Sequence, residues 1–183
     1  MIFPNMRFYP CLALLTLMLV TSCDTKNPNL NEKGQDELTA RRIDKPIQRS
    51  EVEFDATYYV PIYSDIYVGD NIPKEPLAAT LSLRNTSLSD TLFILKIDYF
   101  NTDGGLVKSF IDHQIAILPM ATVNYVIDRD DDSGGSGANF IVEVHARSPE
   151  VKPLVQAVMV GEYSNKAFAF ESDGYIISRG ISE

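Results

Sequence analysis

A chain of 183 residues is long enough for one folded domain with a substantial core. Its net charge of −9 argues against a binding surface for nucleic acid or for anionic lipid head groups. Both cysteines, Cys11 and Cys23, lie near the N-terminus, so the remainder of the chain offers neither a disulfide nor a thiolate metal site.

The first 22 residues have the pattern of a signal peptide. Arg7 precedes an apolar run, CLALLTLMLV, that is far shorter than the roughly 20 residues needed to span a bilayer. The segment Val20–Cys23 resembles a bacterial lipobox, in which the cysteine after the cleavage site is acylated. An ordinary secretory signal with a chance cysteine is the alternative. We predict that residues 1–22 are removed and that acyl chains on Cys23 anchor the protein in the bacterial cell envelope, facing the periplasm or the exterior.

Residues 24–54 are rich in charged and amide side chains and show no sustained apolar period. Such a composition offers too little apolar surface to offset the entropy of ordering it, so we expect a flexible tether. As a coil it would span roughly 30 Å. The predicted organisation is therefore a signal peptide at 1–22, the lipidated cysteine and tether at 23–54, and one folded domain at 55–183.

From Ala56 onwards, short apolar runs alternate with turn signals, a texture typical of strands. The gaps between the runs are too short for the helices of an α/β fold. We predict a single antiparallel β-sandwich of immunoglobulin-like character, with eight or nine strands, rather than a closed barrel. Ten segments have strand character, one or two more than the strands expected, and the alternative for Leu154–Val160 is a helix that begins at Pro153: Tyr58–Tyr67, Leu77–Arg84, Phe93–Tyr99, Leu106–Ile111, Ile115–Leu118, Thr122–Ile127, Phe140–Arg147, Leu154–Val160, Ala167–Glu171 and Tyr175–Ser178.

Three local features make sharper predictions within these segments. Pro61 cannot donate a ladder hydrogen bond, so Tyr58–Tyr67 is expected to be an edge strand or two short pieces. The turns Asp103-Gly104-Gly105 and Asp173-Gly174 each predict a hairpin. Strict alternation would place four apolar side chains on one face of a strand: Phe93, Leu95, Ile97 and Tyr99.

Four motifs, YVPIYSDIY, LAATLSLRNT, SGGSGANFIVE and AVMVG, carry a resemblance across about Thr57 to Ser178. They are similar to those of a family of small bacterial envelope lipoproteins that is catalogued as a domain of unknown function. SGGSGANF is the most specific of them. The resemblance implies an envelope lipoprotein domain, and it implies no activity, cofactor or catalytic residue.

The least ordinary stretch is DRDDDSGGSGANFIVEV, Asp128–Val144, where acids pass into a glycine loop and then into an alternating strand. Gly134, Gly135 and Gly137 lift most steric limits on the backbone, and we predict that at least one of them has φ > 0. The strand should place Phe140, Val142 and Val144 on one face and Glu143, His145 and Arg147 on the other.

The residues of this loop suggest two kinds of chemical site, an enzyme active site and a calcium site. Gly134–Ala138 resembles a G-x-S-x-G elbow, but its last position is alanine and a strand follows instead of a helix. A hydrolase or metal-assisted enzyme there would need a histidine within hydrogen-bond reach of a serine hydroxyl, in a pocket. Its candidate residues are Asp132, Ser133, Ser136 and His145.

The acids of the loop also suggest a weak calcium candidate, because Asp128, Asp130 and Asp132 alternate like the first ligands of a calcium loop. However, the glycine expected at the sixth position is Ser133, and the acid expected at the twelfth is Asn139. A solvated acidic turn is the other interpretation. We expect no bound cofactor.

Tyr59, Tyr63 and Tyr67 gather aromatic rings with polar tips, which suit interfaces and stacking on sugars. Together with the loop they are the candidate binding residues, the loop members being Asp132, Ser133, Gly134, Gly135, Ser136, Gly137 and Asn139. The predicted function is a non-enzymatic module that binds an envelope protein or a small ligand, with a partner's strand pairing along Tyr59–Tyr67 as one mode. A purely structural accessory subunit is a further alternative.

Overall fold

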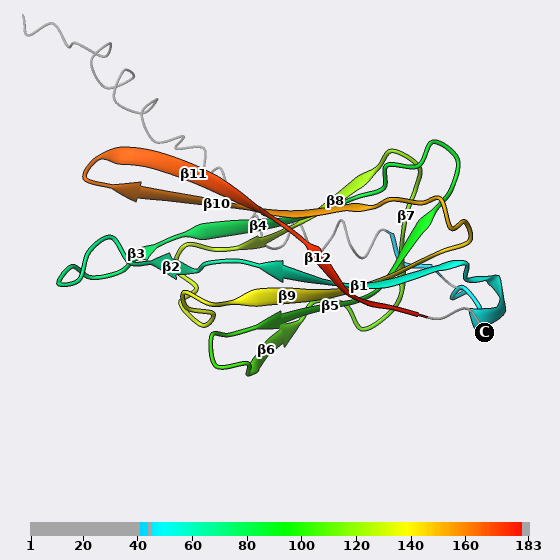
Figure 1. Ribbon diagram of the computed structural model, residues 1–183, viewed down its shortest axis with the longest axis horizontal. Helices are drawn as coiled ribbons and strands as arrows, with labels where there is room; N and C mark the ends of the chain where they lie inside the picture. The colour runs from blue at the N-terminus through cyan, green and yellow to red at the C-terminus, as the bar shows by residue number, and fades with distance from the viewer. Residues whose placement is uncertain (1–40, 44, 181–183) are drawn as a thin grey trace, which may run out of the picture.

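The computed structural model describes residues 41–43 and 45–180, which form two facing β-sheets and a small third one (Figure 1). All pairings are antiparallel. The six-stranded sheet has the order β12–β1–β9–β5–β6, with β7 also paired to β5. Its strands are β1 (Phe54–Pro61), β5 (Leu92–Phe100), β6 (Leu106–Ser109), β7 (Ile115–Ile117), β9 (Asn139–Ala146) and β12 (Tyr175–Arg179).

The four-stranded sheet has the order β11–β10–β4–β8. It consists of β4 (Ala78–Arg84), β8 (Thr122–Ile127), β10 (Leu154–Tyr163) and β11 (Lys166–Asp173). The small sheet pairs β2 (Asp65–Ile66) with β3 (Glu75–Pro76), and the 3₁₀ turn η1 (Arg49–Glu51) precedes β1. The predicted all-β sandwich is confirmed. The described residues form 12 strands rather than eight or nine, because all ten strand-forming segments contain a strand and the two-residue strands β2 and β3 are too short for alternation to reveal.

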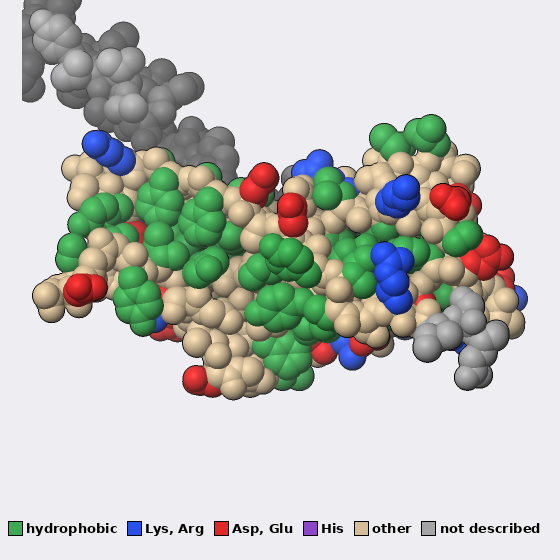
Figure 2. Space-filling model, in the orientation of Figure 1, with side chains coloured by type: hydrophobic (Ala, Val, Ile, Leu, Met, Phe, Trp, Pro, Cys, Tyr) green, Lys and Arg blue, Asp and Glu red, His purple; other side chains and the backbone are tan. Residues whose placement is uncertain are grey.

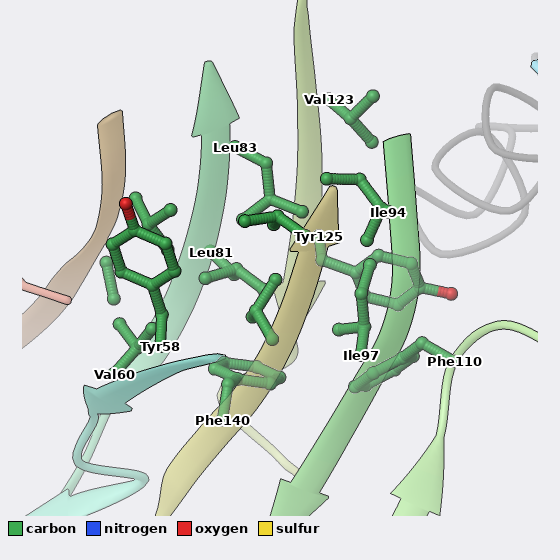
Figure 3. Packing of buried hydrophobic residues seen from close by; sticks show 14 of the residues in the cluster. Tyr58, Val60, Leu81, Leu83, Ile94, Ile97, Phe110, Val123, Tyr125 and Phe140 are labelled. Carbon is green, nitrogen blue, oxygen red and sulfur yellow. The ribbon is translucent and has the colours of Figure 1, made fainter. Parts of the chain in front are cut away.

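The core lies between the two large sheets and follows the period of two in their strands. In β9 the buried residues alternate with partly exposed ones, as predicted, and in β4 Ala79, Leu81 and Leu83 face inward. Figure 3 shows Leu81 and Leu83 in the same packed cluster as Ile97 and Phe140 from the other sheet. Each such fully buried side chain stabilises the fold by about 1.5–3 kcal/mol relative to exposure.

A bulge in β5 corrects the predicted faces of that strand. Its register with β9 shifts between Ile94 and Lys96, so the inward positions change from Leu92 and Ile94 to Ile97 and Tyr99. Phe93 therefore does not belong to the core cluster, and the Arg147 guanidinium covers its ring at 4.9 Å. Leu95, also predicted inward, is only partly buried. An extra residue in one strand reverses the alternation, which a strict period cannot anticipate.

The edge prediction for Tyr58–Tyr67 is wrong. β1 pairs with β9 on one side and with β12 on the other, so it is an interior strand. The alternative of two short pieces holds, because β1 ends at Pro61 and the chain resumes pairing only in β2. A proline at the last position removes no interior ladder bond. Among the described strands, β12 takes the edge position next to β1.

The two predicted hairpins have opposite outcomes. Asp103-Gly104-Gly105 does connect β5 to β6, with φ of 79° at Gly104. Asp173-Gly174 does not close a hairpin, because β11 pairs with β10 whereas β12 pairs with β1. At Gly174 the chain crosses from one sheet to the other. The hairpin that does form is β10–β11, whose turn residues Ser164 and Asn165 have φ of 51° and 60°.

The described part of the predicted tether lies against the sandwich. Arg42 forms a bridge with Ile115, and the Ile47 N–H donates to Gln114 Oε1 at 2.8 Å. Ile47 itself is 8% exposed, so the folded unit begins before residue 55. Cys23 and the predicted signal peptide lie outside the described residues. No helix within the described ranges is both long and apolar enough to cross a membrane.

Candidate functional site

The glycine loop connects β8 to β9 and is joined to two neighbouring segments by hydrogen bonds. The Ser64 N–H donates to the Gly135 carbonyl at 3.0 Å, and the Thr102 N–H donates to the Gly134 carbonyl at 2.8 Å. The Gly137 N–H in turn donates to Thr102 Oγ1 at 2.9 Å. These bonds hold the loop between the end of β1 and the β5–β6 turn.

Two glycines of the loop are required for different reasons. Gly135 has φ of 74°, which agrees with the prediction of a positive φ. Gly134 lies against the core, because a Cβ there would be 1.9 Å from Tyr99 Oη and 2.6 Å from Ser64 Oγ. The Tyr99 hydroxyl and Ser64 Oγ share a buried hydrogen bond of 2.8 Å, and burial raises the pKa of Tyr99. The loop thus closes this end of the core.

The acidic run before the glycines forms a turn. Ser133 donates through its N–H and its hydroxyl to the Asp131 carboxylate, and the Asp131 N–H donates to the Asp128 carbonyl at 3.0 Å. Among the described residues, no group of three or more His, Cys, Asp or Glu side chains is arranged to hold a metal ion. The calcium candidates Asp128, Asp130 and Asp132 accordingly do not form such a group.

The structure does not bring His145 to the loop serines. His145 pairs with Asp55 and Phe93 near the far end of β9, and its Nε2 lies 3.5 Å from the Asp55 carboxylate. Desolvation lowers the pKa of His145. From the start of β9 to this position the strand rises about 20 Å, and Ser136 lies beyond that start.

Ser136 has a different neighbour. Its hydroxyl accepts from Lys74 Nζ at 3.4 Å, and the same ammonium lies 3.0 Å from Asp65 Oδ1. The contact with the Asp65 carboxylate raises the pKa of Lys74, so the ammonium stays protonated and does not act as a base toward Ser136.

A pocket of about 640 Å³ opens beside these residues, within the size range typical of ligand sites. Three aromatic rings line it, from Tyr63, Tyr67 and Phe170, and the polar lining residues are Ser136, Glu171 and Ser172. The aliphatic part of the lining is Pro61, Ile66 and Met159. Figure 2 shows hydrophobic side chains gathered at the end of the molecule that carries β2, β3 and the β10–β11 hairpin.

The pocket lies where β11 extends beyond the point at which the chain crosses between the sheets. β12 begins at Tyr175, opposite Tyr59, so Pro61 at the end of β1 lies beyond the reach of β12. The Ser172 hydroxyl donates to the Pro61 carbonyl and bridges the sheets there. Side chains of β11, rather than a paired strand, therefore border the space between the sheets.

The aromatic lining combines fixed and exposed rings. Tyr63 and Phe170 meet edge to face, with ring centroids 5.8 Å apart and an interplanar angle of 67°. Phe170 also stacks on Phe168. Tyr67 is 70% exposed, and the Lys74 ammonium lies over its ring at 4.7 Å from the centroid. The pocket thus offers apolar and π surface next to charged groups.

Residues 65–76, which we call the flap, form the outer wall of the pocket. β2 and β3 pair through two residue pairs, and the Arg129 guanidinium binds the Glu75 carboxylate at 2.8 Å. Lys74 connects the flap to Ser136. Side-chain contacts therefore join the flap to the acidic turn and to the glycine loop.

Only part of the predicted binding set meets at the pocket. Tyr63, Tyr67 and Ser136 line it, whereas Tyr59 pairs with Tyr175 within the six-stranded sheet. Asn139 starts β9 opposite Pro61 and Phe100. The other predicted loop residues do not line the pocket: Asp132, Ser133, Gly134, Gly135 and Gly137.

The sequence reasoning missed Phe170, Glu171 and Lys74. Phe168 and Phe170 alternate as any core strand does, so the pattern in KAFAFE carries no sign of a pocket. The available signal for Lys74 was that it lies in the same short segment as Asp65 and Tyr67. It could not be interpreted without knowing that the flap folds back on the glycine loop.

An antiparallel sandwich with an aromatic pocket at one end is the class of protein that fold and site define. A family model described as "Protein of unknown function (DUF3124)" matches residues 55–177, and the chain belongs to this family. The predicted membership in a family of unknown function is thereby confirmed. No curated protein matches the chain.

One solved structure is similar, described as "Crystal Structure of Thermotoga maritima 1070", from Thermotoga maritima. It is 15% identical, with a TM-score of 0.37, and the similarity covers 66% of this chain and 92% of that chain.

Proposed function

We propose that this protein is a membrane-anchored envelope lipoprotein that binds a ligand in its aromatic pocket without catalysing a reaction. The observation that carries the proposal is the pocket itself. Segments far apart in the chain supply its three rings, two from Tyr63 and Tyr67 and one from Phe170. An apolar concave site with a few polar groups is the usual form of a ligand-binding site.

The anchoring part of the proposal rests on the signal pattern of residues 1–22 and on the lipobox that ends in Cys23. Replacing Cys23 by Ala should release the protein from the membrane fraction or leave it as an uncleaved precursor. Mass spectrometry of the wild-type N-terminus should detect an acylated Cys23. An unmodified Cys23, or a mature N-terminus elsewhere, would contradict the anchoring.

The absence of catalysis is supported by the surroundings of Ser136. Its neighbour Lys74 is held protonated by Asp65, and His145 belongs to the other end of β9. A nucleophilic serine needs a base within hydrogen-bond reach. The test is a panel of esterase and protease substrates, and an activity lost in Ser136→Ala would contradict this part of the proposal.

Binding at the pocket can be tested by NMR on the full chain, with a fragment mixture that contains aromatic compounds, sugars and organic ammonium ions. We expect at least one fragment to shift the resonances of Tyr63, Tyr67 and Phe170. Tyr67→Ala should weaken the binding, whereas the control Tyr175→Ala removes a similarly exposed tyrosine outside the pocket and should leave it unchanged. A mixture that shifts none of the pocket resonances would overturn the proposal.

A further inference from the structure

The pocket lies at the unpaired edge of β11, and this edge indicates which class of ligand the pocket accepts. We propose that the ligand is an extended peptide segment of a partner protein, which adds a strand to β11 and places an apolar side chain in the pocket. This inference rests on the proposed ligand-binding function and names the class of the ligand.

β11 is the outermost strand of the four-stranded sheet, and among the described strands only β10 pairs with it (Figure 1). The Gly174 N–H donates to the Val155 carbonyl at 2.8 Å, in continuation of the β10–β11 register. Hydrogen-bonded positions recur at every second residue of an antiparallel pair, so the even-numbered residues of β11 direct their backbone groups to β10. The N–H and C=O groups of the odd-numbered residues therefore point away from β10. These residues are Ala167, Ala169, Glu171 and Asp173.

β11 is better suited to accept a strand than the neighbouring edge strand β12. It has eight residues that pair with β10 without a shift in register. β12 has five residues, and its pairing with β1 is interrupted by a bulge. A long, regular edge is a template for a further strand, whereas a bulge twists an edge away from such pairing.

The pocket reaches the edge of β11 at Glu171. Side chains alternate along a strand, so Phe170 and Ser172 face the pocket whereas the Glu171 carboxylate lies on the outer face of the sheet. Glu171 nevertheless lines the pocket, so it borders the pocket with its backbone. A ligand with main-chain amides can pair with the outward N–H and C=O groups of this residue, as peptides do at other exposed sheet edges.

The two faces of β11 determine which side chains the added strand should carry. Phe168 and Phe170 stack on the inner face, so apolar residues are expected opposite them. Glu171 and Asp173 are exposed on the outer face and form no ion pair with a described residue. Oppositely charged cross-strand pairs are stabilising, so basic residues are expected opposite these two acids. The predicted ligand therefore alternates between basic and apolar residues.

The probe for this inference is the end-capped peptide Lys-Val-Lys-Phe-Thr-Val-Thr, designed to pair antiparallel with residues 167–173. Its two lysines would lie opposite Asp173 and Glu171, and its phenylalanine would lie opposite Phe170 and enter the pocket. In NMR titrations of the full chain, we expect it to shift the Phe170 resonances. At saturation it should slow hydrogen exchange at the outward amides of Ala169 and Glu171 and leave that of Phe170, which already faces β10, unchanged.

Two N-methylated versions of the peptide separate strand pairing from side-chain contacts. A methyl group on the amide of the lysine opposite Glu171 removes an N–H that would bind β11, and we expect a roughly tenfold loss of affinity. A methyl group on the next amide, that of the phenylalanine, lies on the side away from β11. This control keeps the same side chains and charge and should bind nearly as well as the unmodified peptide. Equal losses in the two versions would overturn the pairing with β11.

Matched variants of the protein test the charges on the outer face. Glu171→Gln should lower the affinity for the peptide several-fold, because it removes the partner of one lysine. Glu53→Gln is the control, since Glu53 is an exposed acid next to the start of β1, at the other end of the sandwich. Unchanged melting temperatures would show that both variants fold. Equal losses in the two variants would show a general attraction to an acidic protein and contradict binding at this edge.

Three further outcomes separate this inference from the proposed function. If small fragments bind the pocket while the peptide shifts no resonance, the added strand is wrong and the binding function stands. If neither the fragments nor the peptide bind, both proposals fail. A dimer of the chain that the peptide dissociates, measured by analytical ultracentrifugation, would identify a second copy as the occupant of the edge and overturn the partner protein.

Discussion

The glycine loop, which reaches the pocket through Ser136, and the flap, which forms its outer wall, are built in different ways. The glycine loop is held by backbone hydrogen bonds to Ser64 and Thr102, and Gly134 presses against the Tyr99 hydroxyl at the end of the core. The flap opposite contains one two-stranded pairing and is joined to its surroundings by the side chains of Lys74 and Arg129. The glycine loop is part of the packed core, whereas the flap packs against the outside of it.

This difference predicts how the glycine loop and the flap each respond to substitution. Close packing leaves no space at Gly134, so changes in the loop should be measured as losses of stability. Exposed ion pairs contribute little to stability, so changes in the flap should be measured as local motion or altered binding. The substitutions below test this contrast, from the largest expected effect to the smallest.

Gly134→Ala should have the largest effect. Its Cβ would be 1.9 Å from Tyr99 Oη and 2.8 Å from the Ala138 Cβ, so side chains or backbone must shift. Overpacking of this severity should lower the free energy of unfolding by about 3 kcal/mol, measured by urea denaturation. Adding Tyr99→Phe should recover part of the loss, because it removes the nearest clashing atom. A stability equal to that of the wild type would contradict the close packing of the glycine loop at Gly134.

Gly135→Ala should be the next most destabilising, at about 1–2 kcal/mol, measured in the same way. Its φ of 74° disfavours any Cβ, and Thr102 Oγ1 would lie 2.7 Å away. Gly137→Ala is the matched control, because Gly137 does not have a positive φ and its nearest contact would be 3.2 Å. We expect the control to change stability by less than about 0.5 kcal/mol. Equal losses in both variants would contradict a role for the backbone conformation.

Tyr99→Phe should cost about 1 kcal/mol, because it leaves the buried Ser64 hydroxyl without its partner. The double variant Tyr99→Phe/Ser64→Ala removes both groups and should be closer to the wild type in stability. Thermal melting of the two variants measures the difference. A double variant less stable than the single one would show that the hydroxyls act independently.

Lys74→Gln should have the smallest effect on stability, with a melting temperature unchanged within error. Loss of the ammonium removes the contacts with Asp65, Ser136 and the Tyr67 ring, which connect the flap to the loop. Hydrogen exchange should therefore become faster in residues 65–76 and stay the same in residues 133–138. A global loss of protection would show that the flap is as integral to the core as the loop.

Local sequence patterns determined the elements of this protein and several of their faces. Alternation in Phe140–Arg147 identified the inward side chains of β9, because the period of two is a property of any extended strand. The glycines of Asp103–Gly105 identified the β5–β6 hairpin, and those of the glycine loop indicated a positive φ. Each of these signals lies within a few residues of the chain.

Only the tertiary structure decided which strands are neighbours and where the pocket lies. β1 is interior because β12, more than a hundred residues later, pairs with it, and the pairing of β11 with β10 places Phe170 beside Met159 at the pocket. The bulge that turns Leu95 away from the core is likewise a matter of register with β9. Strand order and register depend on the burial of whole sheet faces against each other, and no local period encodes them.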